Sequence, residues 1–225
     1  MFLEEFDDIF ELSHVMIPGN EIFKFELENF QVSEYLPDIK YQQEDWYILS
    51  EITMCSHVGT HIEFPYHYVE DGSDAAEYPF KRCLGEGVVL DFSGKAAGEK
   101  ITEKEVKEIT GGSIEEDIIF IRTDMDKYYR TEDWIKQPYL SVDAMNWVIE
   151  QKPQIVGTDA AGFEDLEADT QPNHDRMFKS NIAMVESVTN LEKLDNDNDN
   201  FVIMLPLPME KADASPVRII ALVKE

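Results

Sequence analysis

The stretch GVVLDFSGKAAGEKITEKEVKEITGGSIEEDIIFIRT, residues 87–123, holds two apolar runs with a helix signal between them. Both runs are rich in β-branched and apolar residues, which is typical of strands. Between them, Thr102 followed three residues later by Glu105 is a capping-box pattern that begins a helix, and Gly111-Gly112 ends it. Strands separated by a helix indicate a mixed α/β domain.

The same alternation continues outward along the chain. Strand-like runs lie at residues 87–92, 117–123, 154–159, 201–207 and 217–223. Ser141 begins a second helix whose apolar residues share one face, and Pro153 lies just beyond its end. Because several runs are wholly apolar, we expect strands buried on both faces. No linker divides the chain, so we expect one α/β domain with a mixed sheet over residues 1–225.

Composition limits the partners of the chain. Its 225 residues include 47 Asp and Glu against 19 Lys and Arg, a formal net charge of -28. Such a surface repels phosphate backbones and anionic headgroups, which argues against nucleic acid and membrane partners. Two cysteines make no disulfide framework, and the acidic N-terminal segment resembles no signal peptide. No apolar run approaches membrane-spanning length, so we expect a cytoplasmic protein.

Three of the five histidines lie in SHVGTHIEFPYHY, residues 56–68. His57, His61 and Glu63 are all odd-numbered, so an extended strand would direct them to one face. The apolar residues at even positions, Val58, Ile62 and Phe64, would face the core. A helix would also place His57 and His61 on one face, as in zinc proteases, but the β-branched residues favour the strand.

His67 lies just past Pro65, which ends strand pairing and can turn the chain back toward the same site. Each histidine taken alone could be a hydrogen-bonded polar residue in a half-buried strand. Two imidazoles and a carboxylate together suit Zn²⁺, Mn²⁺ or Fe²⁺ and leave coordination positions free for water. Clusters of this kind mark metal or catalytic sites, so we predict a metal site here.

A second polar group follows GTDAAGFED, residues 157–165. His174 lies in the polar segment QPNHDR, where simple exposure to solvent is the alternative interpretation. Glu186 lies in NIAMVESVTNL, where it could be an ordinary helix-surface residue. Neither residue indicates a site by itself.

The spacing of the residues from His57 to His67 resembles the H-x-G-T-H-x-D-x-P-x-H signature of the cyclase-like metal-dependent hydrolases, of the bacterial kynurenine formamidase and isatin hydrolase type. The resemblance continues in family order through ELSH, GEGVVLDFSGKAAGEKIT, IFIRTD, LSVDAMNWVIE, VGTDAAGFED and LPLPMEKADASPVRIIAL. It implies a swivelling β/β/α domain with a mixed sheet. It also implies association into homodimers or homotetramers.

The resemblance assigns site residues as well. The implied ligands of one or two zinc or manganese ions per subunit are His57, His61, Glu63, His174 and Glu186. Glu63 and Glu186 would bridge to the second ion. His67 matches the position of the catalytic proton donor and acceptor.

Some positions depart from the family pattern. Glu63 stands where the signature has aspartate, which lengthens this ligand by one methylene. Gly162 replaces a common serine and Glu164 a common aspartate, which indicates a reshaped pocket. Phe23 is the aromatic residue nearest to the position of a substrate-contacting tryptophan, and we expect it to contact substrate.

We therefore predict a metal-dependent hydrolase of an amide-like C–N bond, or of a small cyclic amide or lactone. Its substrate would be a small molecule, with aromatic compounds among the candidates. No Gly-x-Ser-x-Gly elbow appears, so a serine hydrolase route has no support. One alternative is a non-haem iron oxygenase using His61, Glu63 and His174, which leaves His57 and His67 unused and expects an all-β fold. Another is a catalytically silent protein that binds a metal or a small molecule.

Overall fold

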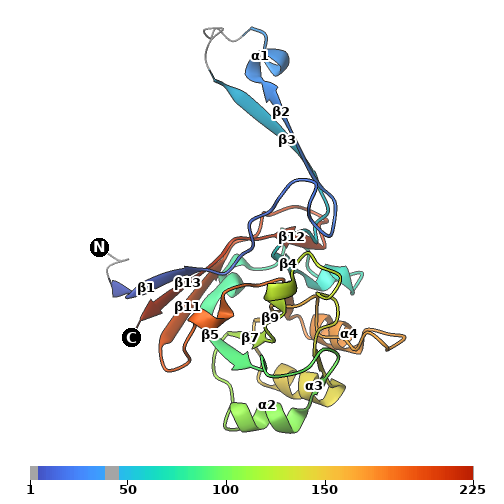
Figure 1. Ribbon diagram of the computed structural model, residues 1–225, viewed down its shortest axis with the longest axis vertical. Coiled ribbons are helices and arrows are strands. Elements are labelled where there is room, and N and C mark those ends of the chain that lie inside the picture. Colours follow the sequence, from blue (N-terminus) through green and yellow to red (C-terminus); the bar gives the residue numbers. More distant parts are fainter. Residues whose placement is uncertain (1–4, 39–45, 225) are drawn as a thin grey trace.

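A curled mixed sheet forms the body of the protein in a computed structural model that describes residues 5–38 and 46–224 (Figure 1). Among these residues the sheet order is β1-β13-β11-β5-β7-β9-β10-β4-β12. Strands β5, β7, β9 and β10 run parallel to one another. All other neighbouring pairs in this order are antiparallel. The mixed α/β class is therefore confirmed. Residues 1–4, 39–45 and 225 of the predicted 1–225 domain, including the start of the N-terminal segment, lie outside the described part.

The strands of this sheet are β1 (Asp8–Glu11), β4 (His61–Glu63), β5 (Leu84–Asp91), β7 (Ile118–Arg122), β9 (Ile155–Thr158), β10 (Ala183–Glu186), β11 (Asp199–Met204), β12 (Ala214–Pro216) and β13 (Ile219–Lys224). Two smaller pairs are β2 (Phe25–Gln31) with β3 (Ile48–Met54) and β6 (Lys100–Ile101) with β8 (Tyr139–Leu140). The α-helices are α1 (Val32–Tyr35), α2 (Glu103–Ile109), α3 (Val142–Glu150) and α4 (Pro172–Lys179). Short 3₁₀ turns are η2 (Pro65–His67), η3 (Phe80–Cys83), η4 (Met125–Tyr128) and η5 (Leu191–Lys193).

Both predicted helix starts are confirmed by their caps. The Thr102 hydroxyl accepts a hydrogen bond from the Glu105 N–H, and the Glu105 carboxylate accepts one from the Thr102 N–H at 2.8 Å. The Ser141 hydroxyl accepts a hydrogen bond from the Ala144 N–H at 3.1 Å. These caps satisfy N–H groups that lack partners in the first turn of each helix.

The central strands are buried on both faces, as predicted. In β7, Ile118 and Phe120 belong to the core enclosed by the curled sheet, whereas Ile119 and Ile121 belong to the core beneath α2, α3 and α4. Successive side chains of a strand point to opposite faces, so an apolar run supplies both cores at once. Each buried aliphatic side chain contributes roughly 1.5–3 kcal/mol.

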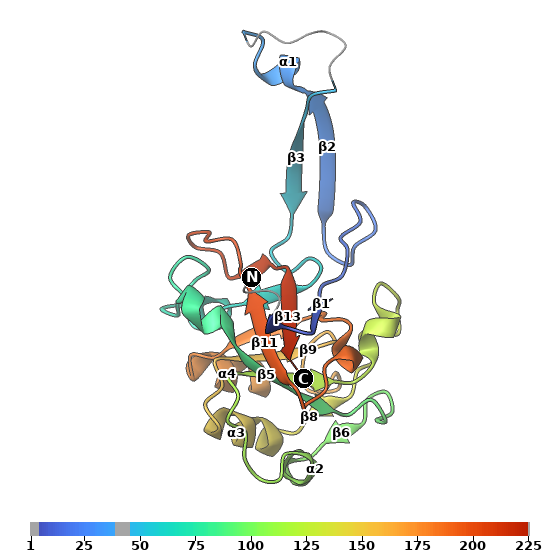
Figure 2. The same cartoon turned by 90° about the vertical axis from the view of Figure 1, so that its left-hand side faces the viewer.

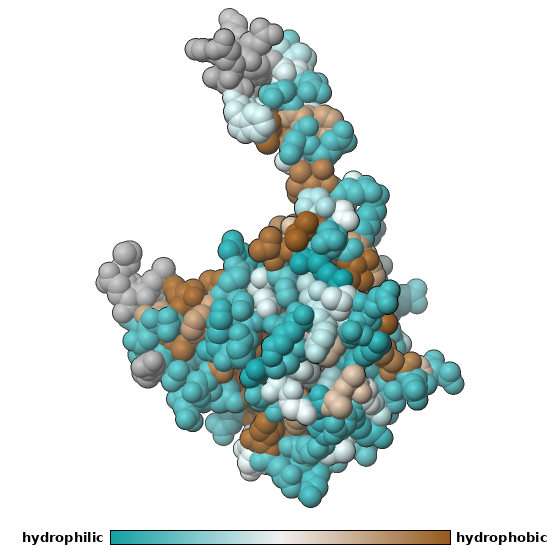
Figure 3. Space-filling model, in the orientation of Figure 1, coloured by the Kyte–Doolittle hydropathy of each residue, from teal (hydrophilic) through white to brown (hydrophobic). Residues whose placement is uncertain are grey.

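Strands β2 and β3 form a hairpin arm that projects from the body (Figure 2). The sequence patterns do not predict this arm. Apolar surface lies along it and at its base (Figure 3). The exposed large apolar side chains of residues 25–54 in the described part are Leu27, Tyr35, Leu36, Trp46, Tyr47, Leu49 and Ile52.

No helix within residues 5–38 and 46–224 combines the length and the hydropathy that crossing a bilayer requires.

Candidate metal centre

The centre lies at the β10-β4-β12 edge of the sheet, where strands distant in sequence are paired. The register of β10 with β4 places Glu186 opposite His61. The register of β12 with β4 places Ala214 opposite Glu63, so that Asp213 also lies beside the centre. Strand pairing therefore brings together residues more than 100 positions apart.

The predicted strand through His57 and Glu63 is shorter than expected, because β4 includes only His61–Glu63. Gly59 has a φ of 70°, which an extended strand does not allow, so His57 lies in the turn before the strand. A Cβ atom at Gly59 would lie 2.9 Å from Cγ of Met16, so the site also requires the close approach that glycine permits. The three side chains nevertheless converge. The strand β4 positions His61 and Glu63, and the turn before it positions His57.

His57, His61 and Glu63 form the first group of potential ligands. Nδ1 of His57 lies 2.8 Å from Oε1 of Glu63 and 3.2 Å from Nε2 of His61. Nδ1 of His61 donates to the Gly59 carbonyl at 3.0 Å, which leaves Nε2 facing Glu63 at 3.3 Å. This hydrogen bond selects the tautomer whose Nε2 lone pair can bind a metal.

Glu63, His174 and Glu186 form a second group that shares Glu63 with the first. Nε2 of His174 lies 3.9 Å from Oε1 of Glu186. Nδ1 of His174 donates to Glu164 at 2.8 Å, so the carboxylate that departs from the family pattern orients this histidine. Gly162 faces the same group, since a Cβ atom there would lie 3.0 Å from Oε1 of Glu186.

Two sequence interpretations of this second group are wrong. His174 does not lie in an exposed loop, because it belongs to α4 and is only 6% exposed. Pro172 at the first position of α4 and Lys179 in its last turn are helix signals that would have indicated this. Glu186 is not on a helix surface, because it ends the buried strand β10.

Glu63 provides a test of whether these residues fit a cation. Its side chain is almost wholly buried, and Oε2 has no hydrogen-bond partner among the described residues. A buried carboxylate oxygen without a partner is costly, and it suits a site in which a cation supplies the missing contact. Two imidazoles and shared carboxylates are also the donors that divalent transition metals prefer. The residues therefore fit a divalent metal ion.

Asp213 is a residue of the centre that the sequence reasoning missed. One oxygen, Oδ2, lies 2.8 Å from Nε2 of His57 and 2.9 Å from Nδ1 of His67, and Oδ1 accepts from the Ser56 hydroxyl at 2.9 Å. Asp213 thus connects a predicted ligand with the predicted proton carrier. Its only sequence signal was the segment LPLPMEKADASPVRIIAL, which resembles the end of the family sequence but does not single out this carboxylate.

Carboxylates control the protonation of the imidazoles. Burial alone would lower the pKa of His57, but hydrogen bonds to Glu63 and Asp213 raise it to about 9. Burial acts in the same way at His174, where Glu164 and Glu186 raise the pKa to about 10. Conversely, burial alone would raise the pKa of Glu63, but the neighbouring imidazoles hold it well below its usual range. The excess of negative charge thus attracts cations, either protons or metal ions.

Aromatic side chains surround the histidines. The ring of Phe23, which is 45% exposed, has its centroid 6.3 Å from that of His57. The ring centroid of Tyr68 lies 6.4 Å from that of Phe178, on which it stacks, and 6.3 Å from that of His174. The centre therefore has both apolar walls and polar donors.

The arrangement does not favour the iron oxygenase. Among the described residues, the donor atoms of His61 and His174 fall in separate groups around Glu63 and form no common triad. The sheet also carries helices, in contrast to the all-β fold expected for that alternative. Cys55 is half-buried and belongs to none of these groups of described residues.

A mixed α/β fold whose sheet edge gathers imidazoles and carboxylates defines a protein suited to hold divalent metal ions. Residues 10–165 match the family described as "Putative cyclase". The chain belongs to this cyclase family.

Known relatives agree with this assignment. The kynurenine formamidase of Bacillus anthracis is 30% identical over 173 residues, which cover 76% of this chain and 78% of the relative. An isatin hydrolase bound to the product analogue thioisatinate has a similar fold, with a TM-score of 0.83, 21% identity, and coverage of 100% of this chain and 95% of that one. Isatin hydrolase A from Labrenzia aggregata, bound to benzyl benzoate, gives a TM-score of 0.78 at 23% identity, covering 97% and 94% of the two chains.

Proposed function

We propose that the protein is a metal-dependent hydrolase that cleaves an amide-like C–N bond in a small molecule, or opens a small cyclic amide or lactone. The observation that carries the proposal is Glu63, a buried carboxylate shared by two groups of metal donors. The kinship with kynurenine formamidases supports the type of bond. Ring-opening hydrolysis is suggested by the isatin hydrolases, which share the fold.

The metal donors named above would hold one or two zinc or manganese ions. When bound, such an ion lowers the pKa of water toward about 7 and polarises a substrate carbonyl oxygen. Hydrogen bonds to the Gly59 carbonyl and to Glu164 fix the ligand imidazoles before any ion arrives. This preorganisation reduces the reorganisation that binding would otherwise require.

His67 is the proton carrier in this proposal. Its Nδ1 faces Asp213, so Nδ1–H donates to the carboxylate and Nε2 keeps its lone pair. Nε2 can then accept a proton from the attacking water and return it to the leaving nitrogen. The rings of His67 and His57 lie 4.6 Å apart, which places this exchange beside the metal donors.

The aromatic walls suggest the shape of the substrate. Phe23 beside His57 and Tyr68 beside His174 are both exposed and offer ring faces to a planar substrate. Aromatic N-formyl amines and isatins are therefore the first compounds to test, and Phe23 is the side chain we assign to substrate contact.

Elemental analysis followed by an activity screen tests the proposal. The protein is stripped with a chelator, reloaded with Zn²⁺ or Mn²⁺, and assayed without oxygen against N-formyl aromatics, isatins, lactones and cyclic ureides. We expect turnover that depends on the metal, and loss of both metal and turnover in Glu63→Gln. A fully loaded protein that is inactive on the whole panel would favour the silent binding protein, and a requirement for oxygen would favour the oxygenase.

We also propose that the chain forms a homodimer or homotetramer in which the arm packs against another subunit. A two-stranded hairpin is marginally stable alone, and this one exposes apolar side chains along its length. Leu27 and Ile52 are cross-strand partners and therefore share one face of the arm.

Light scattering coupled to size-exclusion chromatography measures this association. Ile52→Glu should shift the protein toward monomer, because it places a charge on the apolar face. Thr53→Glu adds the same charge on the opposite face and is the matched control. A monomeric wild-type protein would contradict the proposal.

A further inference from the structure

We propose that Glu21, Arg130 and Tyr129 form a latch that positions Phe23 beside the metal centre and so determines how tightly substrate binds. They are positioning residues and do not react. The inference rests on the proposed function, because it assigns a consequence for substrate binding. The latch itself is a feature of residues 14–23 and 129–130 that can be measured without any substrate.

Glu21 is the centre of the latch, and its side chain has no exposed surface. Its carboxylate accepts hydrogen bonds from Nε of Arg130 at 3.1 Å and from Nη2 of Arg130 at 2.6 Å. It also accepts from the Tyr129 hydroxyl at 2.9 Å and from the Ile17 N–H at 2.6 Å. Burial alone would raise the pKa of Glu21, but the hydrogen bonds from Arg130 keep it lowered, so the carboxylate stays ionised. A buried carboxylate with four donors is a fixed point in an otherwise irregular segment.

Arg130 holds the same segment at a second place, because its guanidinium also donates to the Val15 carbonyl. Its backbone has a φ of 67°, a conformation that is uncommon for residues other than glycine. Such a conformation persists when surrounding contacts determine it, and the guanidinium supplies those contacts. The guanidinium also lies 4.7 Å from the centroid of the Tyr129 ring.

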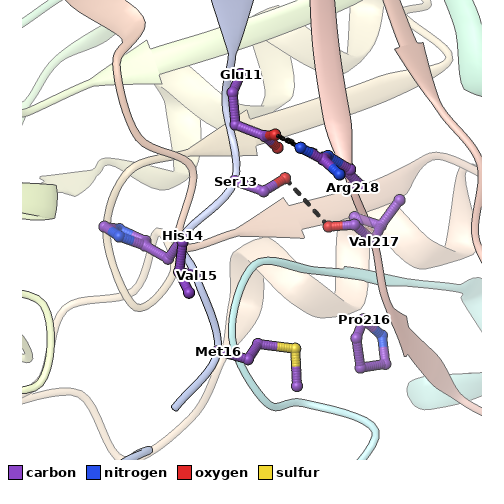
Figure 4. A pocket seen from close by; sticks show the side chains of 8 residues that line it. All are labelled: Glu11, Ser13, His14, Val15, Met16, Pro216, Val217 and Arg218. Carbon is purple, nitrogen blue, oxygen red and sulfur yellow. Dashed lines mark hydrogen bonds and ion pairs between the residues drawn. The ribbon is translucent and has the colours of Figure 1, made fainter. Parts of the chain in front are cut away.

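The latched segment rests directly on the turn that carries the metal donors. The His14 N–H donates to the Thr60 hydroxyl at 2.9 Å, and Met16 packs over Gly59. The His14 ring stacks on Tyr129, with centroids 4.1 Å apart. A surface groove of about 400 Å³ lies between this segment and the residues Pro216 to Arg218. The His14 ring points away from Pro216 and Arg218 (Figure 4).

Phe23 follows Glu21 by two residues, so the carboxylate fixes the chain immediately before the aromatic wall. Phe23 itself is 45% exposed, and its ring centroid lies 6.3 Å from that of His57. An exposed ring has few contacts of its own to hold its place. The latch therefore supplies the positional order that Phe23 lacks.

Substrate kinetics separate this role from a purely structural one. In Glu21→Gln, KM for an N-formyl aromatic substrate should rise about tenfold, because hydrogen bonds to a charged group are lost. Metal affinity and kcat should stay within about twofold, since the metal donors keep their own hydrogen bonds. Arg130→Lys keeps the charge without the planar fork and should recover part of the loss that Arg130→Gln causes.

A double-mutant cycle tests whether the two residues act as one unit. Glu21→Gln combined with Arg130→Gln should raise KM no more than the more damaging single substitution. Arg218→Gln breaks the exposed Glu11–Arg218 ion pair in the lining of the same groove and serves as the matched control, with KM unchanged. Additive effects, or a KM that does not move, would overturn the latch.

Hydrogen exchange provides a readout that needs no turnover. Amide exchange in residues 15–23 should accelerate in Glu21→Gln, while exchange in β7 and β9 stays as in the wild type. Unchanged exchange in residues 15–23 would also overturn the latch. If the wild-type protein hydrolyses nothing in the panel, the proposed function fails while this measurement still decides whether the latch exists.

Discussion

His67 and His57 are neighbouring imidazoles with different partners. His57 faces Glu63 through one nitrogen and Asp213 through the other, whereas the ring of His67 has Asp213 as its one hydrogen-bond partner within the described residues. A histidine whose two nitrogens both face carboxylates is suited to hold a cation. A histidine with one nitrogen free is suited to move a proton.

Replacing His67 separates these roles. His67→Ala should lower kcat by roughly 10²–10⁴, the usual contribution of a general acid–base group. Metal content should stay at the wild-type level, because the two groups of proposed ligands around Glu63 remain complete. Steady-state kinetics and elemental analysis of the same sample measure both quantities, and turnover near that of the wild type would refute the proton-carrier role.

Asp213→Asn should weaken the centre without removing any predicted ligand. The amide keeps the shape of the side chain but loses the charge that orients His57 and His67. Residues that orient metal ligands typically contribute 10–100-fold to metal affinity or activity, and we expect a loss in that range. Asp91→Asn, which removes an exposed carboxylate paired with Arg122, is the control. Equal activity of the two variants would show that Asp213 has no orienting role.

At the scale of elements, β4 explains how so short a strand can hold a site. It has only three residues, but β10 pairs with one edge and β12 with the other. Its backbone is therefore held from both sides. We expect the extra methylene of Glu63 to be accommodated by its side-chain torsions and by the position of a bound ion.

The loop after β9 contributes Gly162, which lies against the second donor group. Gly162→Ala should reduce affinity for a second ion by about tenfold, because its Cβ would crowd Glu186 and the backbone has a φ of 117°. Gly98→Ala is the matched control, since Gly98 also has a positive φ but its Cβ would meet no atom of the described chain within 4 Å. Titration calorimetry with Zn²⁺ or Mn²⁺ measures the effect. Equal affinities in the two variants would show that Gly162 does not influence binding of the second ion.

At the scale of the whole molecule, the formal net charge of -28 includes the carboxylates that raise the pKa values of two imidazoles in the centre. The pKa values of His57 and His174, about 9 and 10, mean that both imidazoles hold protons at pH 7 when no metal is bound. A protonated imidazole cannot bind a metal, so binding has to release protons.

Apparent metal affinity should therefore rise with pH between 7 and 9, by up to about tenfold per unit for each proton released. The affinity rises with pH because a growing fraction of His57 and His174 has already lost its proton as the pH approaches their raised pKa values. Calorimetry in two buffers of different ionisation enthalpy counts the protons at each pH. An affinity independent of pH over this range would mean that the metal-free imidazoles are already neutral.

Local sequence patterns predicted a large part of this protein. The caps at Thr102 and Ser141 and the apolar runs lie in the elements expected, because helix ends and strand periodicity depend on neighbouring residues. The cluster from His57 to His67 was also visible, since its residues are adjacent in the chain. The turn at Gly59 was not, because a β-branched run can be interrupted by one glycine at positive φ.

Only the tertiary structure decided the remainder of the centre. Glu186 reaches His61 through the register of β10 with β4, and Asp213 reaches His57 from the end of the chain. Arg130 meets Glu21 in the same way, across more than 100 residues. Strand registers and such long-range pairs depend on how whole elements pack, and no local periodicity encodes that packing.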